Sequence, residues 1–289
     1  MDTRTDRRME RNSRSCRTLT DRQRKDSAKE GKRQVEKVYG GDRVIKLNSF
    51  LNMDCMDGMK EFPDKYFELA IVDPPYFKGA GDPAYYRGRT CQSKAKPITE
   101  TWNIPGQEYF TELFRVSRKQ IIWGCNYYAQ YIPCVSRIVW DKVNDGTPFS
   151  QAEIASWSDG VKVYMYRYKW NGMIQQDMKN KEFRFHPTQK PVALYSWLLN
   201  QFAKPGDKIL DTHVGSASSL IACHNLGFDY VGFEIDTDYY NMANDRLERV
   251  KSQTTIFDFL PPVIVPLKPC NNLCLTQTLH IQNLTYGKQ

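Results

Sequence analysis

Short apolar runs alternate with stretches of helical periodicity from about residue 43 to residue 251. Leu69–Val72 and Lys208–Leu210 have the length of buried strands, whereas residues 106–119 and Val192–Phe202 repeat apolar residues with a helical period. A chain that alternates strands with helices packs the helices against both faces of a parallel sheet. The pattern therefore predicts an α/β fold with a mostly parallel, twisted sheet. Two further runs, Ile154–Trp157 and Val161–Tyr166, predict a hairpin.

Three segments of different character make up the chain. The first forty residues hold thirteen Lys and Arg against seven Asp and Glu, so they carry +6 of the net charge of +8. They contain almost no large apolar residues and cannot bury enough surface to fold. We therefore expect a disordered extension at 1–41, one domain at 42–251 and an irregular tail at 252–289. The extension is either an arm that contacts phosphates or a solvated tail.

Composition narrows the class of protein. No stretch approaches the ~20 apolar residues that span a bilayer, and the N-terminus lacks the apolar core of a secretory signal. The eight cysteines follow no framework spacing, which favours reduced thiols. We therefore expect a cytoplasmic protein without a membrane partner. Cys270 and Cys274 have no second pair of ligands beside them in the sequence, so we predict no metal site.

The apolar run Glu68–Val72 ends in Asp73, Pro74, Pro75 and Tyr76. Each proline fixes its own φ and restrains the residue before it, so the predicted strand ends in a rigid corner. The Asp73 carboxylate and the Pro74 carbonyl form a pair of acceptors beside the flat ring of Tyr76. Such a corner suits a planar group that carries an exocyclic NH₂. The other interpretation is a strand-ending turn with a packed tyrosine.

A second site is predicted where another apolar strand ends at Asp211. The small residues Gly215 and Ser216 follow, and they allow the backbone to approach a ligand at the carboxyl edge of a parallel sheet. About twenty residues later Glu234 ends a strand, where a carboxylate can accept both hydroxyls of an adenosine ribose. Asp236 shares a face with Glu234 on a continuing strand and is the alternative acid. The pattern predicts a nucleoside site.

A third element, His-Pro-Thr-Gln-Lys-Pro at 186–191, completes a pattern. Together with 73–76, 211–218 and Glu234, it resembles in content and order the permuted, beta-type DNA amino-methyltransferases, in which the catalytic corner precedes the cofactor motif. The resemblance covers about residues 43–250. It implies the Rossmann-like class I methyltransferase fold, S-adenosyl-L-methionine as cofactor and double-stranded DNA as substrate. Restriction-modification is the setting that the family suggests.

The resemblance also implies a role for each matched position. Asp73, Pro74, Pro75 and Tyr76 match the catalytic corner, where Tyr76 would stack on the target base and Phe77 would support the base pocket. The residues matched to cofactor binding are Asp54, Thr188, Lys190, Asp211, Gly215, Ser216 and Glu234. Asp54 matches an acid near the adenine of the cofactor, and Thr188 and Lys190 match positions near its carboxylate. The family usually has an aromatic residue at position 213 and a third glycine at position 217, where this chain has His213 and Ala217.

The implied reaction is direct, in-line methyl transfer to adenine N6 of a base flipped out of the duplex, without a covalent enzyme intermediate. Adenine is favoured because the family more often pairs Asp with adenine and Ser with cytosine N4. Cytosine N4 is the alternative, and a non-catalytic relative that binds DNA or cofactor stays open. Enzymes that methylate RNA or a protein glutamine also stay open, although the glutamine enzymes have Asn in the corner and the reverse motif order.

Residues 77–105 and 167–185 lack periodicity and are the candidate DNA-contacting loops. Lys78, Arg87 and Arg89 lie in the first of them and supply positive charge for the phosphates. A monomer and a homodimer are both compatible with the sequence.

Overall fold

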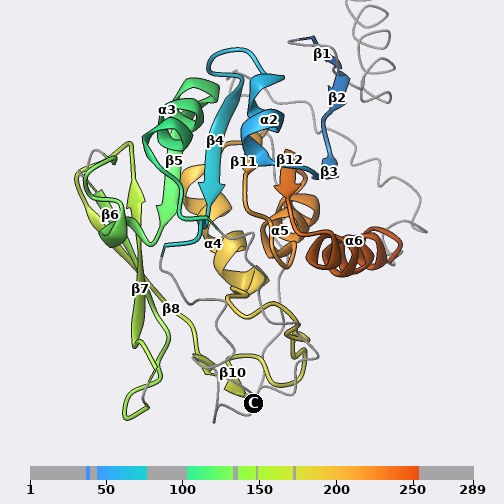
Figure 1. Ribbon diagram of the computed structural model, residues 1–289. Helices are drawn as coiled ribbons and strands as arrows, with labels where there is room; N and C mark the ends of the chain where they lie inside the picture. Colours follow the sequence, from blue (N-terminus) through green and yellow to red (C-terminus); the bar gives the residue numbers. More distant parts are fainter. Residues whose placement is uncertain are drawn as a thin grey trace, which may run out of the picture. The chain divides into compact units, whose positions relative to one another are not determined.

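The computed structural model describes residues 37–39, 44–76, 103–132, 136–147, 149–171 and 174–253. Its centre is an eight-stranded sheet (Figure 1). From one edge to the other, the strands are β3 (Ser49–Asn52), β12 (Asp229–Glu234), β11 (Lys208–Asp211), β4 (Phe67–Val72), β5 (Ser117–Trp123), β7 (Ala152–Trp157), β6 (Ser136–Asp141) and β8 (Val163–Arg167). Seven of them run in the same direction, and only β7 is antiparallel to its neighbours.

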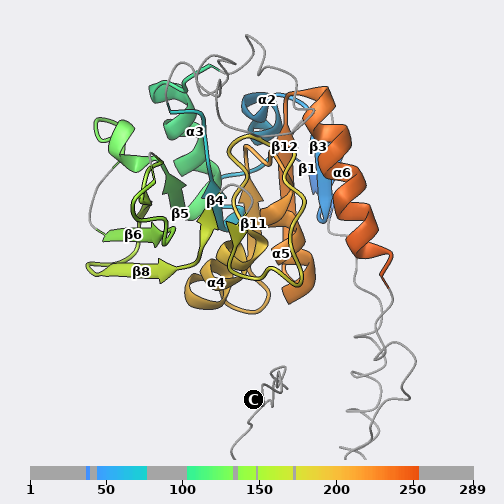
Figure 2. The same ribbon diagram turned by 90° about the horizontal axis from the view of Figure 1, so that it is seen from below.

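Helices cover both faces of this sheet, as the sequence predicts (Figure 2). They are α2 (Cys55–Lys60), α3 (Gln107–Val116), α4 (Val192–Phe202), α5 (Ser218–Leu226) and α6 (Thr237–Lys251), with a 3₁₀ turn, η1 (Cys125–Tyr127). α2 and α3 lie on one face, and α4 and α5 lie on the other. Among the described residues, we find no helix with the length and apolarity needed to cross a membrane.

Strand β4 shows why the apolar runs are uninterrupted. Leu69 and Ile71 pack in the core on the side of α4 and α5, whereas Ala70 and Val72 pack on the side of α2 and α3. All four are at most 1% exposed. A parallel sheet covered on both faces requires apolar side chains at successive positions, rather than at alternate ones.

Two helices beside the sheet begin at aspartates. The Asp54 carboxylate accepts a hydrogen bond from the backbone N–H of Met56 (2.7 Å) at the start of α2. Asp236 accepts from the N–H groups of Asp238 (2.9 Å) and Tyr239 (3.1 Å) at the start of α6. Both aspartates are therefore N-caps, which satisfy N–H groups that have no partner inside the helix.

The predicted hairpin of Ile154–Trp157 with Val161–Tyr166 is wrong. β7 pairs with β5 along one edge and with β6 along the other, so neither edge is left for β8. β8 pairs instead with the outer edge of β6, in parallel register. The short turn between β7 and β8 resembles a hairpin connection in sequence, but the competing partner β6 comes from residues earlier in the chain.

Smaller differences concern the ends of elements. α3 ends at Val116 rather than at residue 119, because Ser117 already pairs with Phe67 as the first residue of β5. β1 (Lys37–Tyr39) lies inside the extension expected to be disordered, and it pairs with β2 (Val44–Lys46). Two short strands, β9 (Trp170–Asn171) and β10 (Ile174–Gln175), pair within the segment predicted to be irregular.

The chain order places a crevice between β4 and β11. From β4 the chain continues through α3 to β5 on one side, whereas from β11 it continues through α5 to β12 on the other. The two neighbouring strands thus lead in opposite directions, and open α/β sheets bind ligands beyond the carboxyl ends of strands at such a point. Asp73 directly follows β4, and Asp211 ends β11.

Candidate active site

A cavity of about 350 Å³ opens at this crevice, within the range typical of ligand pockets. Most of the predicted site residues within the described ranges line it: Asp54, Asp73, Pro74, Pro75, Tyr76, Thr188, Gly215, Ser216 and Glu234. Lys190 and Asp211 are buried behind its wall. The predicted DNA-contacting residues Phe77, Lys78, Arg87 and Arg89 lie outside the described residues.

The two oxygens of the Asp73 carboxylate have different surroundings. Oδ2 accepts a hydrogen bond from the Lys190 ammonium group. Oδ1 is also buried, but it has no hydrogen-bond partner among the described residues. Burial raises the pKa of Asp73, and the charge of Lys190 opposes that rise. Because a buried acceptor without a partner is costly, Oδ1 suits a ligand that donates a hydrogen bond from the cavity.

Tyrosines fix the rest of the corner. The Tyr128 hydroxyl donates to the Pro75 carbonyl and lies 3.3 Å from the Pro74 carbonyl. Tyr76 stacks on Tyr127, with 4.8 Å between ring centroids and 11° between planes. Both partners come from the residues directly after β5, so the strand beside β4 supports the corner. The Pro74 carbonyl retains acceptor capacity, because a carbonyl oxygen has two lone pairs.

Glu234 joins its strand to the small-residue turn. Its Oε2 accepts from the Gly215 N–H (2.8 Å) and its Oε1 from the Asp236 N–H (3.0 Å). Burial raises the pKa of Glu234, whereas these backbone donors lower it. Asp236 caps α6 and is absent from the cavity lining. Of the two candidate acids, the geometry therefore favours Glu234 as the one that faces a ligand.

Asp211 supports the turn from behind. Its Oδ1 accepts from the His213 N–H (3.0 Å), and its Oδ2 accepts from the Ser219 hydroxyl at the start of α5. Burial raises the pKa of Asp211 to about 7. Both oxygens therefore bind the polypeptide, and Asp211 shapes the turn rather than lining the cavity.

The His-Pro-Thr-Gln-Lys-Pro segment passes over this turn. A Cβ atom on Gly215 would lie 3.2 Å from the His186 ring, and Gly215 has a φ of +55°. Glycine thus serves both the close approach and the left-handed conformation. The His186 Nδ1 lies 3.2 Å from the Thr188 hydroxyl, and the ring packs edge-on against Tyr239. Burial lowers the pKa of His186 to about 3, so the ring is neutral at pH 7.

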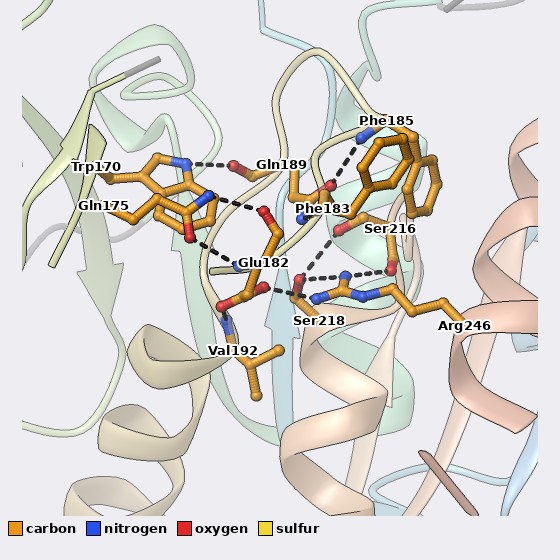
Figure 3. A network of polar contacts seen from close by, with 10 residues as sticks. All are labelled: Trp170, Gln175, Glu182, Phe183, Phe185, Gln189, Val192, Ser216, Ser218 and Arg246. Carbon is orange, nitrogen blue, oxygen red and sulfur yellow. Dashed lines mark hydrogen bonds and ion pairs between the residues drawn. The ribbon is translucent and has the colours of Figure 1, made fainter. Parts of the chain in front are cut away.

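A polar network anchors the same segment to the turn (Figure 3). Arg246 of α6 donates to the Ser216 carbonyl (2.8 Å) and the Ser218 hydroxyl (3.0 Å), and it forms an ion pair with Glu182 (2.6 Å). The other Glu182 oxygen accepts from the Val192 N–H at the start of α4 (2.9 Å). One arginine therefore links the turn, the preceding segment and two helices.

Side-chain amides continue this network through the segment. Gln175 exchanges two hydrogen bonds with the backbone of Glu182, both 2.8 Å long. The side-chain amide oxygen of Gln189 accepts from the Phe185 N–H (3.3 Å), and the backbone carbonyl of Gln189 accepts from the Trp170 indole N–H (2.9 Å). Residues 175–189 are thus held by side chains rather than by regular secondary structure (Figure 3).

Comparison with known proteins matches residues 63–245 to the DNA methylase family of N6 and N4 methyltransferases. The chain belongs to this family. It is 23% identical over 290 residues to the type II methyltransferase M.HinfI of Haemophilus influenzae, covering 84% of this chain and 80% of that protein.

Two solved structures also resemble it. M1.HpyAVI in complex with SAM is 20% identical, with a TM-score of 0.45, covering 68% of this chain and 98% of that one. The cytosine-N4-specific PvuII DNA methyltransferase is 12% identical, with a TM-score of 0.45, covering 70% and 89%.

The two departures from the usual pattern of this DNA methylase family have physical explanations. Ala217 has a φ of +62°, in the left-handed region that glycine adopts without strain. This backbone conformation explains why the usual residue at this position is glycine. His213 lines the cavity, and its ring packs edge-on against Tyr109, so it occupies the place of an aromatic side chain. Burial lowers the pKa of His213 to about 4.

Several residues of the site carry no signal in a single sequence. Tyr127 and Tyr128 stand next to the corner only because β5 lies beside β4. Glu153 of β7 lies 3.0 Å from the Lys190 ammonium group, and Arg246 of α6 contacts the Ser216 carbonyl, although both are far from any motif in the sequence. Antiparallel pairing of β7 with β5 and β6 brings Glu153 to the carboxyl edge of the other strands, and these partners are not apparent from the sequence.

Proposed function

We propose that this DNA methylase transfers a methyl group from S-adenosyl-L-methionine to adenine N6 of a base flipped out of double-stranded DNA. The observation that carries the proposal is Oδ1 of Asp73, a buried acceptor at the cavity that has no hydrogen-bond partner within the described part of the chain. An exocyclic amine is a donor that satisfies it. Asp73 and the Pro74 carbonyl would accept from the NH₂ group, while Tyr76 would stack on the ring.

The other part of the cavity fits the cofactor. Glu234 presents a buried carboxylate for the ribose hydroxyls, and the turn at Gly215 has no side chain to obstruct a ligand. Thr188 and Asp54 also line the cavity. When bound, the cofactor supplies an activated sulfonium methyl group. The role of the protein is then to align the amine with that methyl group and to exclude water.

Adenine is proposed over cytosine because Asp73 occupies the first position of the corner. In the resemblance on which this choice rests, aspartate accompanies adenine more often, and serine accompanies cytosine N4. An ionised carboxylate is also a stronger acceptor than a hydroxyl for an amine that develops positive charge.

The test is incubation of the protein with labelled S-adenosyl-L-methionine and unmethylated duplex DNA, followed by digestion and nucleoside chromatography. We expect label in N6-methyl-2′-deoxyadenosine. Label in N4-methyl-2′-deoxycytidine would overturn the choice of base but keep the reaction class, and absence of label would overturn both. Asp73→Ala should abolish transfer while calorimetry shows cofactor binding similar to that of the wild type.

A further inference from the structure

Asp73 begins a row of four charged side chains, of which Lys190 is buried and the other three are half-buried. Lys190 contacts the Asp73 carboxylate and lies 3.0 Å from Oε2 of Glu153. Glu153 in turn forms an ion pair with Lys142. The four groups come from the end of β4, the segment before α4, β7 and the end of β6. Negative and positive charges alternate along the row, and its formal charge is zero.

Lys190 is the central cation of this row. It is only 3% exposed, and its ammonium group lies 5.4 Å from the centroid of the buried Trp123 ring. Lysine is almost never fully buried unless it is paired. Burial alone would lower the pKa of Lys190, but Asp73 and Glu153 raise it above the usual range. The lysine is therefore held as a cation between two carboxylates.

Glu153 holds Lys190 from the far side, and Lys142 pairs with Glu153 in turn. Burial alone would raise the pKa of Glu153, yet Lys190 and Lys142 lower it to about 2, so it stays ionised. Lys142 also lies over the Trp140 ring, 5.1 Å from its centroid. The other titratable groups near Asp73 include Tyr76 and Tyr128 at the corner, Tyr195 across Lys190, and Asp211 behind the turn.

The row fixes the orientation of Asp73. Because Lys190 binds Oδ2, rotation of the carboxyl group would break a buried ion pair. Oδ1 is consequently the oxygen left for a ligand in the cavity. We propose that Lys190 and Glu153 are positioning residues, which hold Asp73 so that Oδ1 meets the target amine. The identity of that amine rests on the proposed function, whereas the hold on Asp73 does not.

This assignment differs from the role that the sequence predicts for Lys190, which is a position near the cofactor carboxylate. Measurements of kcat and of the cofactor Kd distinguish the two roles. If Lys190 positions Asp73, Lys190→Gln should lower kcat at saturating cofactor by at least roughly tenfold, with the cofactor Kd within about twofold. Glu153→Gln, which leaves Lys190 paired with Asp73, should lower kcat less. A raised cofactor Kd with kcat restored at saturation would overturn the proposal and support the cofactor role.

Lys119 offers a matched control. It also pairs with a carboxylate, Asp159, and lies over a tryptophan ring, Trp157, at 5.8 Å, but it is exposed and is not part of the cavity lining. Lys119→Gln should leave both kcat and Kd unchanged. Far-ultraviolet circular dichroism checks that each variant is folded. If Lys190→Gln does not fold, the milder Glu153→Gln decides: a kcat equal to that of the wild type would overturn the proposal.

A second readout does not depend on DNA. Carbon-13 NMR of labelled aspartates can follow the Asp73 carboxyl group, assigned through Asp73→Asn. Loss of the neighbouring cation should raise its pKa in Lys190→Gln relative to the wild type, whereas Lys119→Gln should leave it unchanged. An unchanged Asp73 titration in Lys190→Gln would overturn the positioning role even in an active enzyme. A wild-type protein that methylates no DNA would instead overturn the proposed function alone.

Discussion

The ring of Tyr76 occupies the space that a side chain on Gly124 would need. A Cβ atom on Gly124 would lie 2.8 Å from Cγ of the ring, and this distance is shorter than real Cβ atoms show in their contacts. Gly124 also has a φ of +66°, at the end of β5. The glycine therefore serves the corner twice: it turns the chain toward η1, and it leaves room for the ring that is proposed to stack on the target base.

Gly124→Ala should displace Tyr76 and lower kcat/KM for DNA by at least roughly tenfold, equivalent to about 1.4 kcal/mol. Cofactor affinity should stay near that of the wild type, because Gly124 packs against Tyr76 and not against the residues proposed to bind the cofactor. The control is Gly206→Ala, at a φ of +90° with nothing within 4 Å of its added Cβ. That variant carries a comparable backbone penalty of about 1–2 kcal/mol and should keep full activity. Equal activity in both variants would contradict the prediction.

Glu234 and Asp236 provide a second matched pair. Glu234→Ala should weaken cofactor binding by at least roughly tenfold, because it removes charge-assisted hydrogen bonds worth about 1.5–3 kcal/mol each. Glu234→Gln should lose less, because an amide still offers one acceptor. Asp236→Ala should instead lower the free energy of unfolding by about 0.5–2 kcal/mol through loss of the α6 cap. Calorimetry and urea denaturation measure both effects, and loss of cofactor affinity in Asp236→Ala alone would reverse the assignment.

Elements with a strong local pattern could be predicted from the sequence. α5 spans Ser218–Leu226, because Ala217 before it and Gly227 after it both take left-handed conformations that end the regular helix. The corner at Asp73 and the turn at Gly215 come together for an equally general reason. Both follow parallel strands, and the carboxyl ends of parallel strands lie at one edge of the sheet.

Contacts across the sheet could not be predicted in this way. The direction of β7 depends on which strands have free edges, and neither periodicity nor turn residues report that. The contact of Lys190 with Asp73 joins residues 117 positions apart, and Glu153 approaches them from the one reversed strand. A motif identifies residue types that suit a ligand, but a lysine suits a protein carboxylate as well as a cofactor carboxylate.

Arg246 should control how firmly residues 175–189 stay on the cofactor turn. Removing one partner of a buried ion pair costs about 3–5 kcal/mol, and both Arg246 and Glu182 side chains are 18% exposed, so we expect the lower end for Arg246→Met. Hydrogen exchange should accelerate at the backbone amides near Glu182, and cofactor affinity should fall. Arg249→Met, on the exposed side of the same helix, is the control. Unchanged exchange in Arg246→Met would show that the segment does not depend on this link.

Asp211 should make the folded protein less stable as the pH rises. Its folded pKa of about 7 lies above the unfolded value of about 3.9, so the folded state holds a proton that the unfolded state has released between these values. Stability is therefore lost as the pH rises from about 4 to 7. Asp211→Asn should remove this pH-dependent contribution. The slope of the unfolding free energy against pH should then become less negative by at most ~1.4 kcal/mol per pH unit. Urea denaturation at pH 5, 6 and 7 measures the slope, and an unchanged slope would contradict the raised pKa.

His186 should have the opposite effect on stability. Burial lowers its folded pKa to about 3, below the unfolded value of about 6.5, so the unfolded state takes up a proton first as the pH falls. The stabilisation is complete above pH 6.5 and is lost toward pH 3, amounting to about 2 kcal/mol by pH 5. In His186→Gln, unfolding should therefore take up about one proton fewer in this pH range, so the unfolding free energy should fall less steeply as the pH is lowered. His213, whose pKa is also lowered by burial, makes a similar contribution that this variant retains. The same denaturation series tests this: if His186→Gln loses stability between pH 6.5 and 5 as steeply as the wild type, the ring is not held neutral over Gly215.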